Sequence, residues 1–355
     1  MEFHALARQQ VPWSDLEFSA DCNIFQTRAW VEFVGATQNA KPVVARLASD
    51  SEVLGYFTGL IVNRFGVKIL ASPMPGWTTP YMGFNLKAGV PRWEALSALR
   101  DFAFLELGCW HLEITDNAVT QEDAQRAGYL TTIKNSYVTD LTPPEEVLFR
   151  NLDNKVRGNL RKAQRSGVKI QEATDLAFAD EYYDQLKDVF AKQGLVPTYP
   201  VERIRELIRR LLPTGHLLLL RAVEPGGRCI ATDICFGMGD DAFIFGNASY
   251  RADQNLRPNQ ALHWHAIRYW KAHGAKTFDW VGGSTYKEKY GVVPTTHVAC
   301  RASRIACLEG LRATAQSAYR LRQVIAGRIH SHGESSHSSA KELYERDSRA
   351  ELAQK

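Results

Sequence analysis

The sequence predicts an α/β protein of the α+β kind, built from two successive units that a basic helix joins. Three observations lead to this prediction. The chain has 355 residues, enough for about two domains at roughly 150 residues each. Strand-like apolar runs alternate with segments of helical periodicity along both halves. Between the halves, residues 143–167 are strongly basic and have the pattern of a connecting helix.

Composition and charge exclude several classes of protein. The chain is 45% hydrophobic and 23% charged, with 43 basic and 39 acidic side chains, which is a formal net charge of +4. This balance permits contact with phosphates but is far from that of a nucleic-acid coat protein. No stretch reaches the roughly 18 uncharged apolar residues of a membrane span. The amino terminus lacks a basic start followed by an apolar block, so we expect no secretory signal.

Cysteine usage indicates a reducing compartment. The six cysteines are scattered and form no Cys-x-x-Cys pair. We therefore expect reduced, mostly buried thiols in a cytoplasmic protein and no structural zinc site. His263 and His265 are two positions apart on a predicted helix and face different sides, so they do not form a metal pair.

The first unit, residues 1–142, is expected to begin with an amphipathic helix, because Phe25, Ala29, Trp30 and Phe33 recur at helical spacing. Strand-like runs follow, and three prolines and two glycines make residues 72–84 a loop or an irregular strand. The elements expected in order are helix 25–35, strands 42–47, 53–62 and 67–70, helix 92–107, strand 110–114, helix 121–127 and strand 137–141.

The connecting helix is expected over residues 143–167, because Pro143 and Pro144 suit a helix start and Gly167 suits its end. The second unit, residues 168–307, then repeats the alternation, and residues 308–355 are expected to form a basic helix and a flexible polar tail. The elements expected in the second unit are strand 168–170, helices 180–193 and 200–212, strands 216–222, 228–237 and 242–249, helix 258–273, and strands 276–281 and 297–304.

Three sequence motifs carry a resemblance to a known family. IFQTRAW at residues 24–30 resembles F-x-Q-[ST]-x-x-W, and NKVRGNLRKAQRSGVKI at 154–170 resembles R-x-x-[IL]-R-K-A-x-x-x-G. FDWVGG at 278–283, followed by YKEKYG at 286–291, resembles F-D-x-x-G followed by F-K-x-x-F-G. The motifs and the order of elements resemble the Fem-type (FemAB-like) aminoacyl and peptidyl transferases, which consist of two tandem acyltransferase units of the GNAT fold.

This resemblance implies an N-acyltransferase that forms an amide on an amine of a cell-envelope, peptidoglycan or other glycan precursor. The donor would be aminoacyl-tRNA or another activated acyl group, and the acceptor a small molecule or a glycan linked to a nucleotide or lipid. A second hypothesis is an acyl-CoA-dependent transferase acting on an amino sugar or amino acid in polysaccharide or natural-product synthesis. A third is a non-catalytic scaffold for envelope intermediates, with the helix expected over residues 308–329 against an anionic membrane surface. No tightly bound cofactor is expected.

The chemistry expected is direct attack of the amine on a positioned acyl group, because no Ser-His-Asp or Cys-His spacing is present. Lys287 occupies the lysine of the F-K-x-x-F-G motif, and the resemblance implies that it stabilises the oxyanion. Pattern alone favours a solvated loop lysine, and the motif match favours the catalytic role instead. Asp279 would accept a proton or orient the amine, or it would hold the following loop through backbone hydrogen bonds. Tyr286 and Tyr290 replace phenylalanines of the motif and are expected to be core aromatics with hydroxyls on polar partners.

The donor side is expected around the start of the helix at Pro258. Acyl-CoA-dependent relatives grip a pyrophosphate there with a glycine-containing turn, but residues 254–261 contain no glycine. This departure favours another donor, such as a tRNA acceptor end. The candidate donor-binding residues are Asn247, Ser249, Arg251, Arg257, Asn259 and Tyr286.

The basic helix and the first unit supply the remaining candidates. Arg157, Arg161 and Lys162 match the family signature and are expected to contact phosphates or to serve a structural purpose. Trp77 and Tyr81 would line an acceptor groove or belong to a buried irregular connection. In the family, a lysine soon after the opening tryptophan contacts the diphosphate of the acceptor, but here no lysine follows Trp30 until Lys41.

Overall fold

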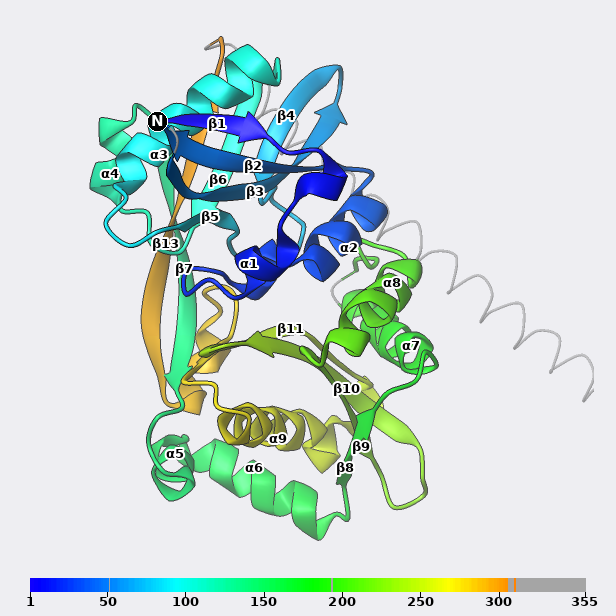
Figure 1. The fold of residues 1–355 in the computed structure, drawn as a ribbon. Helices are drawn as coiled ribbons and strands as arrows, with labels where there is room; N and C mark the ends of the chain where they lie inside the picture. Colours follow the sequence, from blue (N-terminus) through cyan, green and yellow to red (C-terminus); the bar gives the residue numbers. More distant parts are fainter. Residues whose placement is uncertain (51, 193, 306–309, 311–355) are drawn as a thin grey trace, which may run out of the picture.

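The computed structural model describes residues 1–50, 52–192, 194–305 and 310. Except for Gly310, the basic helix and tail expected over residues 308–355 lie outside the described residues, as does Cys307. The predicted fold class is confirmed, because strands and helices alternate along both units (Figure 1). The strands are β1 (Glu2–Ala5), β2 (Lys41–Ser49), β3 (Glu52–Arg64), β4 (Val67–Ser72), β5 (Gly83–Leu86), β6 (His111–Asp116), β7 (Leu130–Asp140), β8 (Lys169–Ala173), β9 (Leu217–Val223), β10 (Cys229–Met238), β11 (Asp241–Ser249), β12 (Thr277–Asp279) and β13 (Val292–Ser303).

Helices cover the strands of both units. The α-helices are α1 (Trp13–Glu17), α2 (Arg28–Gln38), α3 (Arg92–Asp101), α4 (Gln121–Arg126), α5 (Glu145–Asn151), α6 (Asn154–Arg165), α7 (Phe178–Ala191), α8 (Glu202–Leu211) and α9 (Pro258–Ala272). Short 3₁₀ helices are η1 (Arg8–Gln10), η2 (Ile24–Gln26), η4 (Leu212–Thr214), η5 (Arg251–Leu256) and η6 (Thr285–Tyr290), and η3 (Phe102–Glu106) is a short π-helix.

Within the described residues, the strands form one continuous mixed sheet of 13 strands. The order is β1-β2-β3-β4-β6-β13-β7-β12-β11-β10-β9-β8, with β5 added beside β3. The order is nearly symmetric about its centre: β4 is parallel to β6 in the first unit, and β11 is parallel to β12 in the second. The remaining pairs are antiparallel. The two units therefore share a plan that their sequences do not reveal as a repeat.

The two units exchange their last strands at the centre of the sheet. β13 ends the second unit but lies between β6 and β7, with Cys300 opposite Ile114 and Thr131. β7 ends the first unit but also pairs with β12 of the second, with Thr139 opposite Phe278. The long β7–β13 ribbon runs from one unit to the other in Figure 1. Because each unit completes the sheet of the other, the backbone hydrogen bonds link the units directly.

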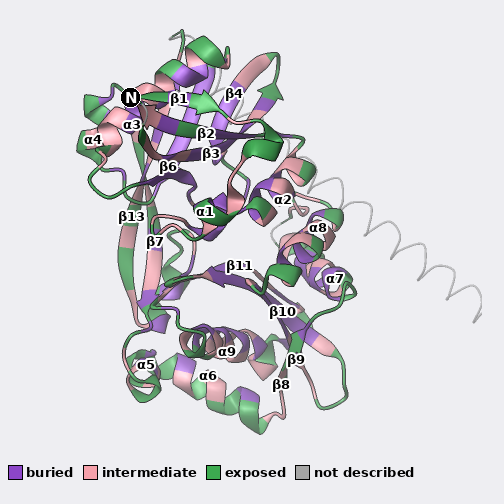
Figure 2. Ribbon diagram, viewed as in Figure 1, coloured by how far each residue is buried: buried purple, intermediate pink, exposed green. Residues whose placement is uncertain are grey.

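Three apolar clusters form the core, and one of them spans both units. Phe25 of the first unit lies edge-on against Phe236 on β10 and Phe243 on β11, and Trp30 lies edge-on against Phe236, with ring centroids 4.9–5.5 Å apart. A second cluster lies between α3 and the first-unit strands, and a third lies between α9 and strands β9–β11. Figure 2 shows much of β10 and β11, and part of α9, in the purple of buried residues. Burial of this much aromatic surface between the units joins them into a single structure.

Several predicted elements have different boundaries in the structure. The single connecting helix expected over 143–167 is two helices, α5 and α6, because Leu152 is extended and the side chain of Asp153 caps α6 at the N–H of Lys155. β7 and β13 begin well before the apolar runs that were expected, because polar residues pair along the ribbon. β1 and α1 were not predicted. Among the described residues, no helix is long and apolar enough to cross a membrane.

Candidate active site

The candidate active site lies where β11 and β12 separate. The two parallel strands pair only over Asp241–Phe243 and Thr277–Asp279. Beyond that point β11 continues along β10 to Ser249, while the other strand turns into the loop that leads to η6. Helix α9 covers this region, and its first turn lies near the end of β11, where Asn259 donates to Ser249 Oγ at 3.2 Å. Where the two parallel strands separate, their backbones no longer form hydrogen bonds to one another, so side chains occupy the space between them.

Lys287 lies at this divergence. Its side chain is buried, although the polar residues around it in the sequence suggested a solvated loop. Its Nζ donates to the carbonyl oxygens of Val281 at 2.7 Å and Gly282 at 2.9 Å. Burial lowers the pKa of the ammonium, while the charge of Asp279 opposes that shift. An ammonium has three hydrogens to donate, and these two contacts use two of them. The ammonium group is therefore held in place with one donor remaining.

Asp279 fixes the loop after β12. Its Oδ1 accepts from Ser136 Oγ at 2.5 Å and from the backbone N–H of Val281 at 2.7 Å. Its Oδ2 lies 3.8 Å from Nε2 of His297 on β13. These contacts connect β12, β7 and β13 at the point where the units meet. The geometry corresponds to the loop-holding alternative considered for this carboxylate.

A buried polar group that was not predicted lies beneath the same loop. Asp233 on β10 is 0% exposed, and neither of its carboxyl oxygens has a hydrogen-bond partner. Its Oδ2 lies 3.8 Å from Nε2 of His263 on α9, which also has no hydrogen-bond partner. Nδ1 of His263 lies 3.0 Å from the hydroxyl of Tyr290 on η6. Asp233, His263, Tyr290 and Lys287 are called the buried floor below.

Burial dominates the electrostatics of the floor. It raises the pKa of Asp233 well above 3.8, although the amide of Asn247 acts in the opposite direction. It lowers the pKa of His263 to about 3, with the nearby Lys287 ammonium as the second cause. Both shifts favour the neutral form, since a buried charge without a partner is costly. Burial likewise lowers the pKa of Lys287, but there the charge of Asp279 favours the ammonium.

No curated protein matches the chain, but one family model and several solved structures do. Residues 150–290, which hold all of the buried floor, match the family described as acetyltransferase (GNAT) domain. The matched residues include most of the second unit, which is called the acyltransferase domain below. The expected enzyme class is thus confirmed at the level of an acyltransferase.

Solved structures of low sequence identity share the fold over both units. FemX is similar with a TM-score of 0.65 at 14% identity, over 84% of this chain and 97% of that one. A tandem GNAT protein from the clavulanic acid biosynthesis pathway matches with a TM-score of 0.51 at 13% identity, over 85% and 98%. L-PGS from Bacillus licheniformis matches with a TM-score of 0.50 at 13% identity, over 80% and 90%. The Fem-like, tandem GNAT architecture that the motifs suggested is confirmed.

The predicted donor-side residues of the acyltransferase domain lie around the start of α9. Asn247 is half-buried and donates to the carbonyl oxygen of Thr232 at 3.1 Å, and Ser249 is buried. Asn259 Oδ1 is buried without a hydrogen-bond partner. Asn247 lies directly opposite Asp233 in the β10–β11 register. Asn247, Asn259 and Gln260, all of intermediate exposure, are called the rim below.

The two predicted arginines of the acyltransferase domain differ in environment. Arg257 has a left-handed backbone, with φ 61°, and its half-buried side chain leaves Nε without a hydrogen-bond partner. Arg251 is exposed, and its backbone N–H donates to Asp188 at 2.7 Å. Arg257 is therefore near the first turn of α9, whereas Arg251 lies at the surface.

The two tyrosines of the C-terminal motif also differ. Tyr290 is buried and places its hydroxyl against His263, as expected of a core aromatic with a polar partner. Tyr286 was expected in the core but is 46% exposed. It is the second residue of η6, on the part of that short helix that is open to solvent. Its ring centroid lies 5.7 Å from the Lys287 ammonium, so it covers the cation from outside.

Trp77 and Tyr81 belong to the core between the units. Trp77 is buried, and its carbonyl oxygen accepts from Arg203 of α8 at 2.5 Å. The ring of Tyr81 lies between those of Phe25 and His297, at centroid distances of 5.4 and 4.9 Å. The stretch from Trp77 to Tyr81 has the buried, irregular form that was the alternative to an acceptor groove.

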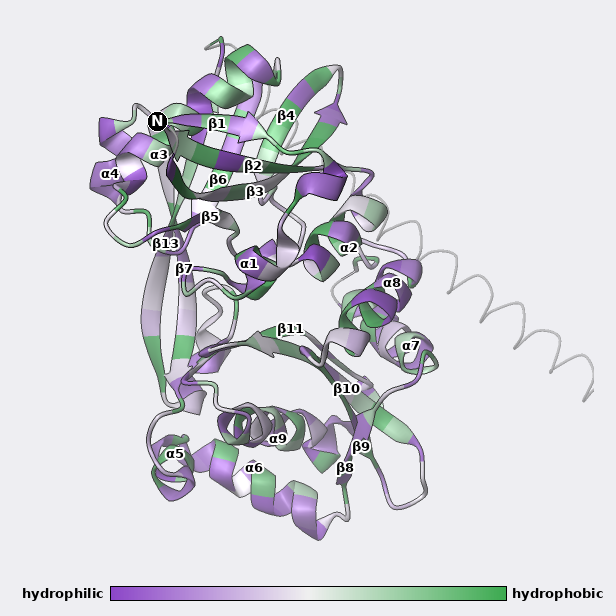
Figure 3. Ribbon diagram, in the orientation of Figure 1, coloured by the Kyte–Doolittle hydropathy of each residue, from purple (hydrophilic) through white to green (hydrophobic). Residues whose placement is uncertain are grey.

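The basic residues of α6 lie on its outer surface. Arg161 and Lys162 are exposed, and Arg157 is half-exposed and turned back on its own helix, where it donates to the carbonyl oxygen of Arg150 and the side chain of Asn154. Val156 and Ala163 are buried on the opposite side, toward α9. Figure 3 shows α6 as mostly hydrophilic at the edge of the acyltransferase domain. The helix thus presents positive charge outward without an acidic residue of its own.

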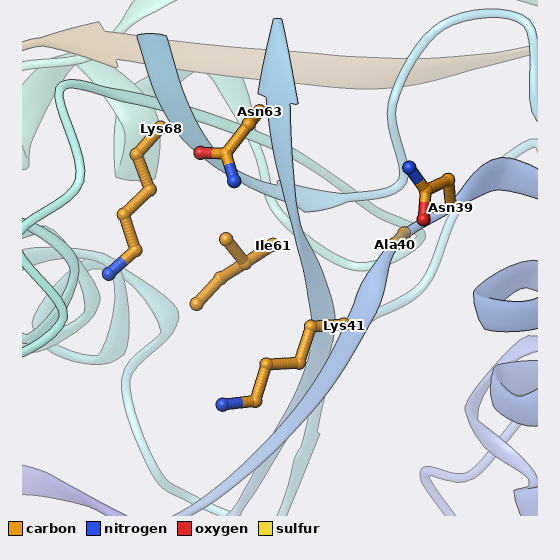
Figure 4. Close-up of a pocket in the computed structure, with 6 residues that line it drawn as sticks. All are labelled: Asn39, Ala40, Lys41, Ile61, Asn63 and Lys68. Atoms are coloured by element: carbon orange, nitrogen blue, oxygen red, sulfur yellow. The ribbon is translucent and has the colours of Figure 1, made fainter. Parts of the chain in front are cut away.

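A cavity of about 400 Å³ lies in the first unit, away from the floor. Lys41 and Ile61 are opposite one another on β2 and β3, and Asn63 and Lys68 are opposite one another on β3 and β4. Figure 4 shows the two lysine side chains extending from this sheet face in the same general direction. Lys68 Nζ donates to the carbonyl oxygen of Leu107 at 2.5 Å. The lining residues are Asn39, Ala40, Lys41, Ile61, Asn63 and Lys68.

Proposed function

We propose that the protein forms an amide by transferring an aminoacyl group from aminoacyl-tRNA to an amine of a cell-envelope or glycan precursor. The single observation that carries the proposal is the buried Lys287 ammonium, held at the divergence of β11 and β12 in the acyltransferase domain. As the carbonyl carbon of an ester is attacked, negative charge develops on its oxygen. A fixed ammonium in a water-poor site stabilises that charge more than a solvated one does.

The step is direct attack of the amine on the ester. The nitrogen forms a bond to the carbonyl carbon, the bond to the 3′ oxygen of the tRNA breaks, and a proton passes from the nitrogen to that oxygen. Holding amine and ester together supplies much of the acceleration. Cys229 and Cys235 of the same domain have pKa values raised by burial, which disfavours the thiolate that a covalent pathway would need.

Two features support tRNA rather than acyl-CoA as the donor carrier. The first turn of α9 contains no glycine and begins with Pro258, which has no N–H to offer a pyrophosphate. The outer face of α6 presents Arg161 and Lys162, as expected of a surface that follows a phosphate backbone. The solved structures of related fold include FemX and L-PGS, and the comparison with them is of fold alone.

An acceptor that carries phosphates is also supported. Lys41 and Lys68 line the first-unit cavity, and no carboxylate is among its lining residues. A nucleotide-linked or lipid-linked glycan would bring the matching negative charge. We place the acceptor on the first unit because the candidate donor residues all lie in the second.

The proposal is tested by incubating the purified protein with bulk-charged radiolabelled tRNA or with acetyl-CoA. Each donor is combined in turn with nucleotide-linked, lipid-linked and free amino-sugar acceptors. We expect an amide product from charged tRNA with one acceptor class. Turnover with acetyl-CoA that resists RNase, without turnover from tRNA, would establish the acyl-CoA alternative instead. The absence of transfer from both donors would favour the scaffold hypothesis.

A further inference from the structure

The buried floor contains more hydrogen-bond acceptors than the chain itself satisfies. Both carboxyl oxygens of Asp233 are buried and unpaired, and so is Oδ1 of Asn259. Nε2 of His263 is a fourth such atom, and it accepts when Nδ1 carries the proton toward Tyr290. A buried polar atom without a partner destabilises the folded protein. Their grouping in one place indicates a site made to receive hydrogen-bond donors.

Polar residues of the rim adjoin the floor along β11 and at the start of α9. Asn247 lies opposite Asp233 across the β10–β11 pair, and Asn259 and Gln260 form the first turn of α9. All three have intermediate exposure. The Asn247 amide donates to the carbonyl oxygen of Thr232 at 3.1 Å. Asp233 is fully buried and neither of its carboxyl oxygens has a partner within hydrogen-bond distance, although the nearby Asn247 amide lowers its pKa.

We propose that Asp233 binds the free α-amino group of the aminoacyl donor, with His263 Nε2 as a second acceptor. The inference rests on the function proposed above and specifies how the donor is recognised. The Asp233 oxygen and the His263 nitrogen are 3.8 Å apart, so one ammonium nitrogen at about 2.9 Å from each can donate to both. A simple acyl group, such as acetyl, has no N–H on its acyl portion to offer.

Electrostatics favours an amine over a neutral donor. The carboxyl of Asp233 has a raised pKa because it is buried without a counter-ion. Arrival of an ammonium supplies that counter-ion, so the carboxyl ionises and a charge-assisted hydrogen bond forms. A donor without this amine leaves the Asp233 carboxyl and the His263 imidazole without a hydrogen-bond partner, so the cost of their desolvation is not offset. A site made for a hydrogen-bond donor discriminates strongly against ligands that lack it.

The test uses stable analogues of the aminoacyl-tRNA end, so that binding is measured without transfer. The probes are 3′-deoxy-3′-(aminoacylamino)adenosines carrying glycine, alanine, serine or lysine, each with an α-N-acetyl counterpart. Titration calorimetry compares the wild type with Asp233→Asn, which keeps the shape and removes the charge. Asp233→Ser is a second variant, and Asp240→Asn is the control, because Asp240 is an exposed carboxylate paired with Lys276.

We expect at least one free-amine probe to bind the wild type and the Asp240→Asn variant equally. Its affinity falls at least tenfold in Asp233→Asn and Asp233→Ser, whereas the N-acetyl probe binds all four proteins equally weakly. Equal binding of the free-amine probe to the wild type and Asp233→Asn overturns the inference and leaves the proposed donor class intact. Failure of every probe to bind the wild type overturns the inference and contradicts the proposed donor. Thermal unfolding of each variant confirms that it is folded.

Discussion

The Nζ of Lys287 lies 2.7 Å from the carbonyl oxygen of Val281, whose backbone is left-handed with φ 47°. A β-branched residue rarely adopts this conformation. Two groups hold it: the N–H of Val281 donates to Asp279, and its carbonyl accepts from Lys287. The loop and the ammonium therefore fix one another, at the place where a donor ester would meet the acyltransferase domain.

Replacing Lys287 with methionine, which keeps an unbranched apolar stem, should lower kcat for amide formation about 100-fold. The expected reason is loss of oxyanion stabilisation, for which mutated donors typically cost 10²–10³ in kcat. Donor KM should change much less. The measurement is steady-state transfer over a range of donor concentrations, with Lys289→Met as a matched control, since Lys289 is exposed in the same short helix.

The purely structural alternative for Lys287 gives a different result. If the side chain only anchors the loop, Lys287→Arg and Lys287→Met should lower the thermal stability, and kcat should fall only in proportion to the folded fraction. A kcat for Lys287→Met within about threefold of the wild type, after correction for the folded fraction, would contradict the oxyanion assignment.

The pH dependence of stability should show His263 and Asp233 acting in opposite directions. The folded-state pKa of His263 is about 3, below its ordinary 6.5, so between these values the unfolded chain binds a proton that the folded one does not. Stability is therefore lost as pH falls through this window, by at most about 1.4 kcal/mol per pH unit. The raised pKa of Asp233 has the reverse sign: its contribution is lost as pH rises above 3.8.

Urea titrations from pH 4 to pH 8 measure both contributions. His263→Gln should reduce the loss of stability on acidification. Asp233→Asn should become more stable relative to the wild type as pH rises above 3.8, until the carboxyl ionises in the folded protein. Parallel curves for the wild type and both variants would show that neither group has a shifted pKa.

Neutralising the outer face of α6 should weaken tRNA binding in a salt-dependent way. In the triple variant Arg161→Gln, Lys162→Gln, Arg165→Gln, the slope of log affinity against log salt should become shallower by about 2, because each lost phosphate contact removes about 0.7–0.9. The control neutralises Lys187, Arg205 and Arg209, which lie on α7 and α8 and pair with acidic residues. An unchanged slope in the α6 variant would exclude this face as the tRNA surface.

Fragments 1–142 and 143–355 should not fold when produced alone. The first lacks β13, which lies between β6 and β7, and the second lacks β7, which lies beside β12. Each would expose sheet edges and the aromatic cluster around Trp30 and Phe236. Circular dichroism and size-exclusion chromatography of the fragments, separately and mixed, measure this. A monomeric, cooperatively unfolding fragment 1–142 would contradict it.

Sequence predicted the elements of this fold better than their connections. Amphipathic spacing around Trp30 and the helix start at Pro258 depend on neighbouring residues, and both appear as expected. The exchange of β7 and β13 depends on pairing between residues about 170 positions apart, such as Arg301 and Leu130. Local patterns contain no information on such partners. The polar character of these strands hid their full length as well.

The candidate site shows the same difference between features set by neighbouring residues and features set by residues distant in sequence. The motif match indicated Lys287, which is buried beside the diverging strands, although its polar neighbours suggested exposure. Asp233 gave no signal, because a single aspartate in the apolar strand Cys229–Met238 has no partner nearby in sequence. Its significance comes from His263, 30 positions away, which only the packing of α9 brings close. Isolated polar residues in apolar strands are the one signal that could have indicated it.

The most direct test of the central claim is the amount of amide that the wild-type protein forms in a single turnover from bulk-charged radiolabelled tRNA, with and without prior RNase treatment. The account predicts product from intact charged tRNA, loss of that product after RNase treatment, and a sharply slower reaction with Lys287→Met. Equal amounts of product with and without RNase treatment, or full activity in Lys287→Met, would contradict it.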